Sequence, residues 1–134
     1  MNRFFACALL LAFGVVGGCK DDEPAAVKTP GTLSVNLATP NSGQDGGAVV
    51  QISGPVAPRS VTAASGLTLW GGPVTTPQST IALTGVLSSG TILMIEVEDV
   101  TLASQYSATL REVSNTDATV ALRVLTGYSL SVVR

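Results

Sequence analysis

The chain has 134 residues, of which 46% are hydrophobic and 12% charged, and its formal net charge is −2. This share of apolar side chains argues against intrinsic disorder, and the few scattered arginines argue against a nucleic-acid binder, which needs a clustered basic surface. The sequence contains no histidine, so the commonest general base and metal ligand is missing.

The N-terminal segment has the three-part plan of a bacterial signal peptide. Arg3 gives a short positive start, residues 4–16 are uncharged and apolar, and the polar sequence KDDE follows Cys19. As a helix the apolar run would measure roughly 20 Å, which is too short to cross a bilayer core comfortably. We therefore expect residues 1–18 to be a signal peptide.

The residues at the end of this segment, Val16, Gly17, Gly18 and Cys19, resemble the lipobox of bacterial lipoproteins. The resemblance implies cleavage between Gly18 and Cys19 and attachment of a diacylglycerol to the Cys19 thiol. Two or three acyl chains on one residue would anchor the mature protein durably in a membrane. The alternatives are an ordinary secretory signal that happens to end near a cysteine, or a buried apolar helix.

Residues 19–30 are expected to form the lipidated cysteine and an extended tether. The segment from Lys20 to Pro30 is charged, contains proline and lacks a periodic apolar pattern, so it can reach on the order of 30 Å. The expected location is the cell envelope. In the lipoprotein resemblance, Lys20 directly after Cys19 favours the outer membrane where the organism has one, and otherwise the external face of the plasma membrane.

Residues 31–134 are expected to form one all-β domain. Apolar and polar residues alternate in short runs; in the first, Leu33, Val35 and Leu37 share one face. Strands are expected at 32–38, 48–52, 60–64, 67–70, 80–84, 92–97, 106–113, 119–125 and 128–133. Eight or nine such strands favour an antiparallel β-sandwich, either Ig-like or of the cohesin and jelly-roll type.

Two segments between these strands need a separate interpretation. The sequence from Asn41 to Gly47 offers several oxygen atoms, but it lacks the full pattern of a calcium-binding loop, so we expect a connecting turn that includes Asp45-Gly46-Gly47. The segment from Val100 to Tyr106 is the one weak helix candidate, and we expect a loop there.

The order of segments in the domain is loosely similar to that of cohesins and related sandwich modules that bind carbohydrate. The segments that carry the likeness are LSVNL at 33–37, DGGAVVQISG at 45–54, TGVLSSGTIL at 84–93 and YSATL at 106–110. The resemblance implies a sandwich that binds a protein or a glycan. The tyrosine-rich segment that often follows the second strand of cohesins is missing.

Glu96, Glu98 and Asp99 are the acidic candidates for a site. Two residues apart on a strand, Glu96 and Glu98 would share one face, where they could bind calcium through carboxylate oxygens or act as an acid/base pair. A solvated strand face is the simpler interpretation. We therefore expect no cofactor, with calcium as the alternative.

Trp70, Tyr106 and Tyr128 are the aromatic residues from which a sugar-stacking surface could be built. Trp70 is expected at a strand end, where an exposed ring could contact a ligand, but packing in the core is the favoured interpretation. With no histidine, no G-x-S-x-G motif and no cysteine after Cys19, the sequence offers no activated nucleophile. We expect a protein that is not an enzyme.

Two functions remain open. The first is a membrane-anchored cell-envelope lipoprotein whose sandwich is a non-catalytic interaction or structural module that holds another envelope protein. The alternative is a lipid-anchored carbohydrate-binding module. The aromatic share of 4% favours the first. Edge strands that carry few charges also favour it, because they can pair with another chain.

Overall fold

The structure is a computed structural model that describes residues 24–71, 76–117 and 119–134. The expected signal peptide, the lipobox and Cys19 lie outside these ranges. The elements are β1 (Gly31–Ala38), β2 (Asp45–Ser53), β3 (Ser60–Ala63), β4 (Thr68–Trp70), β5 (Gln78–Leu87), β6 (Gly90–Val97), the 3₁₀ helix η1 (Val100–Gln105), β7 (Ser107–Asn115) and β8 (Ser129–Val133).

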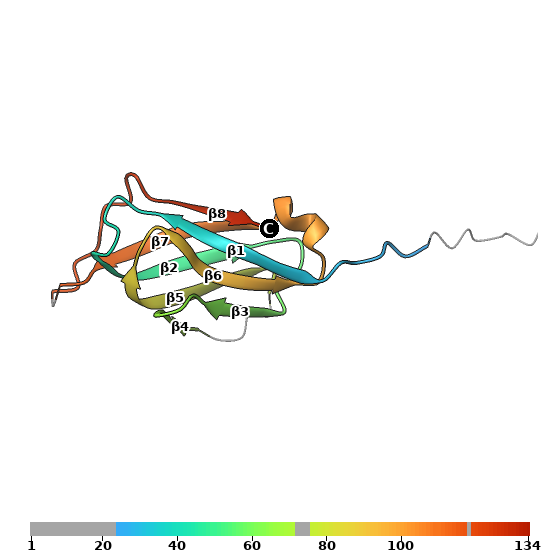
Figure 1. Cartoon of the computed structure of the whole chain (residues 1–134), viewed down its shortest axis with the longest axis horizontal. Helices are drawn as coiled ribbons and strands as arrows, with labels where there is room; N and C mark the ends of the chain where they lie inside the picture. Colours follow the sequence, from blue (N-terminus) through green and yellow to red (C-terminus); the bar gives the residue numbers. More distant parts are fainter. Residues whose placement is uncertain (1–23, 72–75, 118) are drawn as a thin grey trace, which may run out of the picture.

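The strands form two four-stranded antiparallel sheets that pack face to face, so the predicted all-β sandwich is confirmed (Figure 1). Sheet A has the order β3-β6-β1-β8 and sheet B the order β4-β5-β2-β7. The chain crosses from one sheet to the other at every connection except that between β4 and β5, which both belong to sheet B. Each long central strand therefore contributes its apolar face to the same core.

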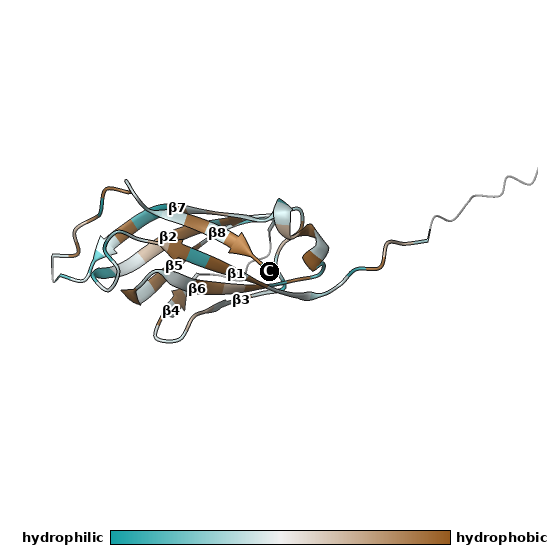
Figure 2. Ribbon diagram, turned by 45° about the horizontal axis from the view of Figure 1, so that its top comes forward, coloured by the Kyte–Doolittle hydropathy of each residue, from teal (hydrophilic) through white to brown (hydrophobic). Residues whose placement is uncertain are grey.

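Alternation along the central strands produces this core. Leu33 and Val35 are completely buried and Leu37 is 2% exposed, as the period-two pattern predicts. Figure 2 shows the same alternation as brown and pale residues along the strands. Burial of a side chain of this size contributes about 1.5–3 kcal/mol. The other core residues are Ala48, Val50, Ile52, Ile81, Leu83, Leu87, Ile92, Leu93, Ile95, Val97, Val100, Tyr106 and Val113.

β-bulges adjust the alternation where the sequence departs from it. The register between β1 and β6 shifts between Val35 and Asn36, and the consecutive residues Ile92 and Leu93 are both buried there. The register between β2 and β7 shifts between Val49 and Val50. A bulge inserts one unpaired residue and redirects the side chains around it.

The tether and the C-terminus lie at the same end of the sandwich, next to η1 (Figure 1). The expectation of a loop at 100–106 is wrong, because this segment forms one short 3₁₀ helix. The Asp99 side chain accepts a hydrogen bond from the Thr101 backbone N–H and so caps the helix, and Val100 is 5% exposed and anchors it to the core.

The strand expected at 119–125 does not form. Residues 119–128 form a C-terminal strap instead. Its residues 121–123 lie beside the end of β7, with one isolated bridge between Ser114 and Leu122 and a backbone hydrogen bond on either side of it. Val120 has a positive φ of 47°, which interrupts an extended strand. In the strap, the alternating apolar residues Leu122 and Val124 are 66% and 81% exposed, so they do not point into the core.

The turn expected across Asp45-Gly46-Gly47 is also wrong. The turn lies before them, where the Gln44 N–H donates to the Asn41 carbonyl over 2.9 Å. Asp45 is already the first residue of β2 and is completely buried. Pairing with both neighbouring strands skips Gly46, so this glycine is a bulge residue.

Candidate functional site

The outer face of sheet B carries the candidate functional site. One row of paired residues crosses all four strands of this sheet, in the order Trp70, Ala82, Val49 and Glu112. With strands about 4.8 Å apart, the row from β4 to β7 spans about 14 Å. It places a large aromatic side chain at one side of the sheet and a carboxylate at the other.

Trp70 is 58% exposed, so the expectation that it packs in the core is wrong. Its neighbour Leu69 points inward instead and packs against the core. The indole Nε1–H donates to Thr84 Oγ1 over 2.8 Å, which ties the ring to the next strand of the sheet. The polar edge of the ring is therefore satisfied by the protein, while much of the ring surface stays in solvent.

A shallow hollow of about 190 Å³ lies beside Thr84 on this face. Its floor is made of residues with short side chains, among them Gly47 and Ala82, and its far side is formed by Glu112, Ser114 and Leu122. Pockets for drug-sized ligands usually measure about 300–1,000 Å³. A hollow of this size suits one unit of a longer molecule that lies across the sheet.

Gly47 keeps the floor of the hollow low. A Cβ at this position would lie 3.0 Å from the Leu83 carbonyl oxygen and 3.1 Å from Ser114 Oγ, both tighter than ordinary contacts. The missing side chain allows β5 and β7 to bring Thr84 and Ser114 to either side of the same point of β2. Two hydroxyl groups thus border the floor.

The bulge in the pairing of β2 with β7 determines which polar groups face outward. Val49 pairs with Glu112 and Val50 with Leu110, which leaves Arg111 as the extra residue. Arg111 and Glu112 are consecutive and both exposed. The Arg111 guanidinium donates to Gln51 Oε1 on the neighbouring strand, so it is held along the sheet.

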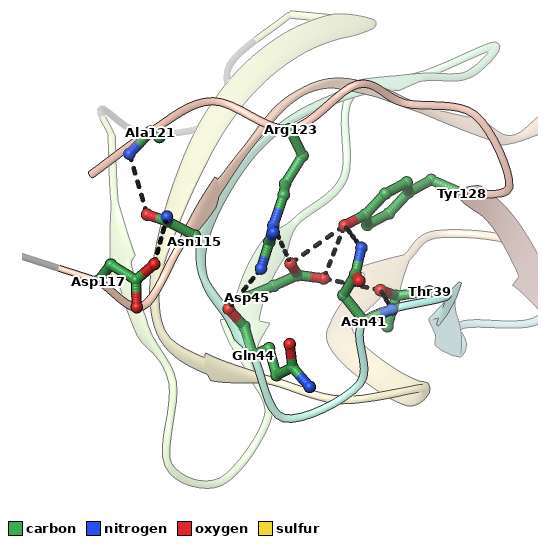
Figure 3. Close-up of polar contacts among 9 residues, drawn as sticks. All are labelled: Thr39, Asn41, Gln44, Asp45, Asn115, Asp117, Ala121, Arg123 and Tyr128. Atoms are coloured by element: carbon green, nitrogen blue, oxygen red, sulfur yellow. Dashed lines mark hydrogen bonds and ion pairs between the residues drawn. The ribbon is translucent and has the colours of Figure 1, made fainter. Parts of the chain in front are cut away.

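A second polar cluster surrounds the first residue of β2, at the end of the sandwich opposite the tether (Figure 1), and its contacts are drawn in Figure 3. The buried Asp45 carboxylate lies 3.1 Å from Arg123 Nε, and its Oδ2 accepts a hydrogen bond from Thr39 Oγ1 over 2.7 Å. Tyr128 Oη lies 3.0 Å from both carboxylate oxygens and accepts a hydrogen bond from Asn41 Nδ2 over 2.9 Å. This cluster joins the loop after β1, the first residue of β2 and the C-terminal strap.

The polar cluster around Asp45 positions the C-terminal strap. Arg123 also donates from Nη2 to the Gln44 carbonyl over 3.1 Å, and its backbone N–H donates to the Val113 carbonyl over 2.7 Å. Leu122 is the adjacent residue and lines the hollow. The Asp45–Arg123 ion pair therefore holds Leu122 in its position at the side of the hollow.

The other two aromatic residues do not join Trp70. Tyr106 is 6% exposed, and its hydroxyl donates to the Val56 carbonyl oxygen over 3.0 Å. Burial raises the pKa of the Tyr106 hydroxyl above its ordinary value of 10.0, and the charges of Glu98 and Asp99 add to this increase. Tyr128 belongs to the polar cluster around Asp45. Within the described chain, no aromatic platform of the three residues forms.

The acidic candidates have separate partners. Glu96 is exposed on β6 and accepts a hydrogen bond from Ser60 Oγ over 3.0 Å. β6 ends at Val97, so Glu98 lies beyond the strand, and the shared strand face expected for the two glutamates is wrong. Glu98 forms an ion pair with Lys28 Nζ over 2.6 Å. In the ranges that the structure describes, no three acidic or cysteine side chains gather as a metal site.

The contacts of Glu98 and Asp99 lower the pKa values of both carboxyl groups. The hydrogen bond from Lys28, and then its charge, keep the pKa of Glu98 below the ordinary 4.5. Hydrogen bonds from the Thr101 side chain and backbone lower the pKa of Asp99 from 3.8. The Val100 N–H also donates to the Thr29 carbonyl over 2.8 Å. These groups attach the last residues of the expected tether to the domain.

Sequence reasoning found Trp70 but not the other residues of this face. The hollow depends on the register of four strands, which brings residues 47, 82, 84, 112 and 122 together. No local pattern carries that information. The role of Asp45 was not predicted because an aspartate before two glycines is typical of a turn. Its burial is explained by contacts with residues outside that motif, above all Arg123 and Tyr128, which are 78 and 83 residues away.

The chain has no match among protein-family models, curated proteins or solved structures. None of the helices in the described part of the chain is long and apolar enough to cross a membrane. The lipobox residues Val16, Gly17, Gly18 and Cys19 lie outside the described residues.

Proposed function

We propose that this protein is a membrane-anchored cell-envelope lipoprotein whose β-sandwich is a non-catalytic binding module. The observation that carries the proposal is the half-exposed Trp70, tied to Thr84 beside a hollow on the outer face of sheet B. An exposed indole is a large apolar surface, and tryptophan is enriched among the residues that contribute most to binding.

The arrangement of the tether supports this function. Residues 24–30 are exposed and form neither helix nor strand, and the tether leaves the sandwich beside η1 (Figure 1). Lys28 and Thr29 contact the domain, so the tether that would separate it from the anchor is the segment from Lys20 to Val27, whose length would be about 25 Å in an extended conformation. The hollow lies near the first residues of β2, and β2 begins at the end of the sandwich opposite the tether (Figure 1), so an anchored domain would leave the hollow accessible to a partner.

Two variants test the two halves of the proposal. In the full-length precursor, Cys19→Ser is expected to prevent acylation and to move the protein from the membrane fraction to the soluble fraction. A photo-crosslinking residue in place of Thr84 is expected to capture an envelope component in intact cells. The same residue in place of Met94, which is 38% exposed on the outer face of sheet A, is the matched control.

Each half has an outcome that contradicts it. Unchanged membrane attachment of the Cys19→Ser protein would disprove the lipid anchor. Equal crosslinking from positions 84 and 94 would show that sheet B has no preferred partner. The partner can be another envelope protein or a glycan, and the chemistry of the face decides between them.

A further inference from the structure

The geometry points to a neutral carbohydrate chain as the ligand of the outer face of sheet B. This inference rests on the proposed function, because it names the class of molecule that the same face would bind. Trp70 would provide the apolar platform, and Glu112, Ser114 and Thr84 would provide hydrogen-bonding groups around the hollow.

On the outer face of sheet B, an apolar surface lies next to hydrogen-bonding groups, which is the arrangement that a sugar ring requires. A sugar ring presents C–H groups on its faces and hydroxyl groups around its rim, so it requires a flat apolar surface next to hydrogen-bonding groups. Trp70 and the low floor at Ala82 and Gly47 provide the apolar part. Glu112 and Ser114 stand across the floor, and a carboxylate can accept hydrogen bonds from two hydroxyl groups at once.

The size of the site favours a chain over a single small molecule. The hollow of about 190 Å³ is too small to enclose a drug-sized ligand, yet the row from Trp70 to Glu112 spans about 14 Å. A ligand that contacts both ends of this row must lie across β4, β5, β2 and β7. A linear polymer of ring units can place one unit in the hollow and another against the indole.

The charges on this face argue against an ionic ligand. The outward residues on the three strands β4, β5 and β2 are uncharged, among them Trp70, Thr84 and Gln51. The guanidinium of Arg111 is held by Gln51, and among the residues that the structure describes Glu112 forms no ion pair. Arg111 and Glu112 bring one positive and one negative charge to β7, so the face has no net charge that would select an ionic polymer, whereas the Glu112 carboxylate can accept hydrogen bonds from neutral hydroxyl groups.

The same features argue against a peptide ligand. Peptides usually bind by adding a strand to a sheet edge or by filling apolar pockets. The hollow instead lies over the middle of sheet B, where the backbones of β5 and β2 are already paired on both sides. Besides the Trp70 indole, the groups that face a ligand at the hollow are side-chain hydroxyl groups and one carboxylate.

The first experiment distinguishes a glycan from a protein partner. The mature chain from residue 19 onward, with Cys19→Ser to avoid detergent, is immobilised and exposed to solubilised envelope extract from the source organism. One portion of the extract is untreated, one is digested with protease, and one is oxidised with periodate, which cleaves vicinal diols. Trp70→Ala, Glu112→Gln and the control Met94→Ala are immobilised in parallel, each after its circular dichroism has matched that of the parent chain.

The carbohydrate inference requires that polysaccharide is retained from the untreated and protease-digested extracts and lost after periodate oxidation. Trp70→Ala should weaken retention by about 10-fold or more, Glu112→Gln by less, and Met94→Ala not at all. Retention should not change in 0.5 M NaCl, because a neutral ligand is insensitive to screening. Loss of retention in salt would contradict a neutral ligand.

The remaining outcomes separate this inference from the proposed function. Retention that protease abolishes and periodate spares, and that still requires Trp70, would overturn the carbohydrate inference but keep sheet B as a binding face. Retention of glycan that is unaffected by Trp70→Ala would overturn the site. If no component distinguishes the parent chain from Trp70→Ala, both the inference and the proposed use of this face are wrong.

A direct titration completes the test, because Trp70 is the one tryptophan in the sequence. Oligosaccharides released from the retained polysaccharide by partial hydrolysis are added to the same Cys19→Ser chain in solution. Stacking of a sugar ring on the exposed indole should shift its fluorescence emission to shorter wavelength, with saturation. Retention on the resin with no spectral change would place the glycan elsewhere on the molecule.

Discussion

Arg123 Nε lies 3.1 Å from Oδ1 of Asp45, although 78 residues separate them in the sequence, and the Asp45 side chain is completely buried. The pair connects the first residue of β2 with the C-terminal strap. Thr39 and Tyr128 complete the hydrogen bonding of the carboxylate. A charge this deep in the sandwich is tolerated because every oxygen has a donor.

Asp45→Asn is expected to destabilise the fold by about 3–5 kcal/mol. The substitution removes the charge that Arg123 and Tyr128 face and places amide hydrogens among their donors. In a domain of roughly this size, the loss lowers the melting temperature by more than about 10 °C. Urea titration and calorimetry measure both quantities.

Asp117→Asn is the matched control for this prediction, because Asp117 is exposed and its Oδ2 accepts one hydrogen bond, from Asn115. Its effect should stay within about 0.5 kcal/mol. Equal stability of the two variants would show that the polar cluster around Asp45 contributes little to the fold.

Val120→Asn is expected to stabilise the protein by about 0.5–1 kcal/mol. Val120 has a φ of 47°, and a β-branched residue is strained in this left-handed region, whereas asparagine adopts it readily. The side chain is 64% exposed, so the change loses little burial. The melting temperature should rise by a few degrees.

Val124→Asn controls for the change in surface polarity, because this valine is 81% exposed and lacks a positive φ. It should leave the melting temperature almost unchanged. A gain of similar size in both variants would mean that the backbone conformation at Val120 is not the cause.

The sequence predicts the inner faces of the sandwich well and its polar contacts poorly. The alternation around Leu33, Val35 and Leu37 is local, so period two is enough to identify them as core. The strap has the same alternation, yet Leu122 and Val124 are exposed. The difference is that β1 lies between two neighbouring strands, while the strap forms one bridge at the edge of β7.

The candidate site shows the same limit. The residue type of Trp70 indicated a possible ligand contact, but its orientation depends on Leu69 taking the inward position of β4. Gly47 and Glu112 gave no signal, because they become neighbours of the hollow through pairing of β2 with β5 and β7 and through the bulge at Arg111. Such long-range register is not encoded in any single segment.

The Lys28–Glu98 ion pair is expected to respond to pH in a defined window. The pKa of Glu98 is lowered below 4.5 and that of Lys28 is raised above 10.5, in each case first by their hydrogen bond. The stabilisation by Glu98 is therefore full above 4.5 and is lost as the pH falls through its lowered pKa. The stabilisation by Lys28 is full below 10.5 and is lost as the pH rises through its raised pKa.

Titration of the Glu98 carboxyl carbon by NMR checks this prediction. Lys28→Met should return the midpoint toward 4.5, and Lys28→Arg, which keeps the positive charge, should keep it lowered. High salt should reduce the shift, because both side chains are exposed to solvent. The same midpoint in the parent chain and in Lys28→Met would show that the pair does not persist in solution.

Thr84→Val is expected to free the Trp70 ring while leaving the fold intact. The valine keeps the β-branched shape but cannot accept the hydrogen bond that Trp70 Nε1–H donates over 2.8 Å. Because the contact is exposed, its loss should cost less than about 1 kcal/mol of stability. The fluorescence anisotropy of the single tryptophan should fall as the indole gains rotational freedom.

Thr80→Val is the control, because Thr80 lies on the same outer face of β5, four residues before Thr84. This variant should leave the anisotropy unchanged. If Thr84→Val also leaves it unchanged, side-chain packing rather than the hydrogen bond positions the ring, and a ligand would meet the same platform in both proteins.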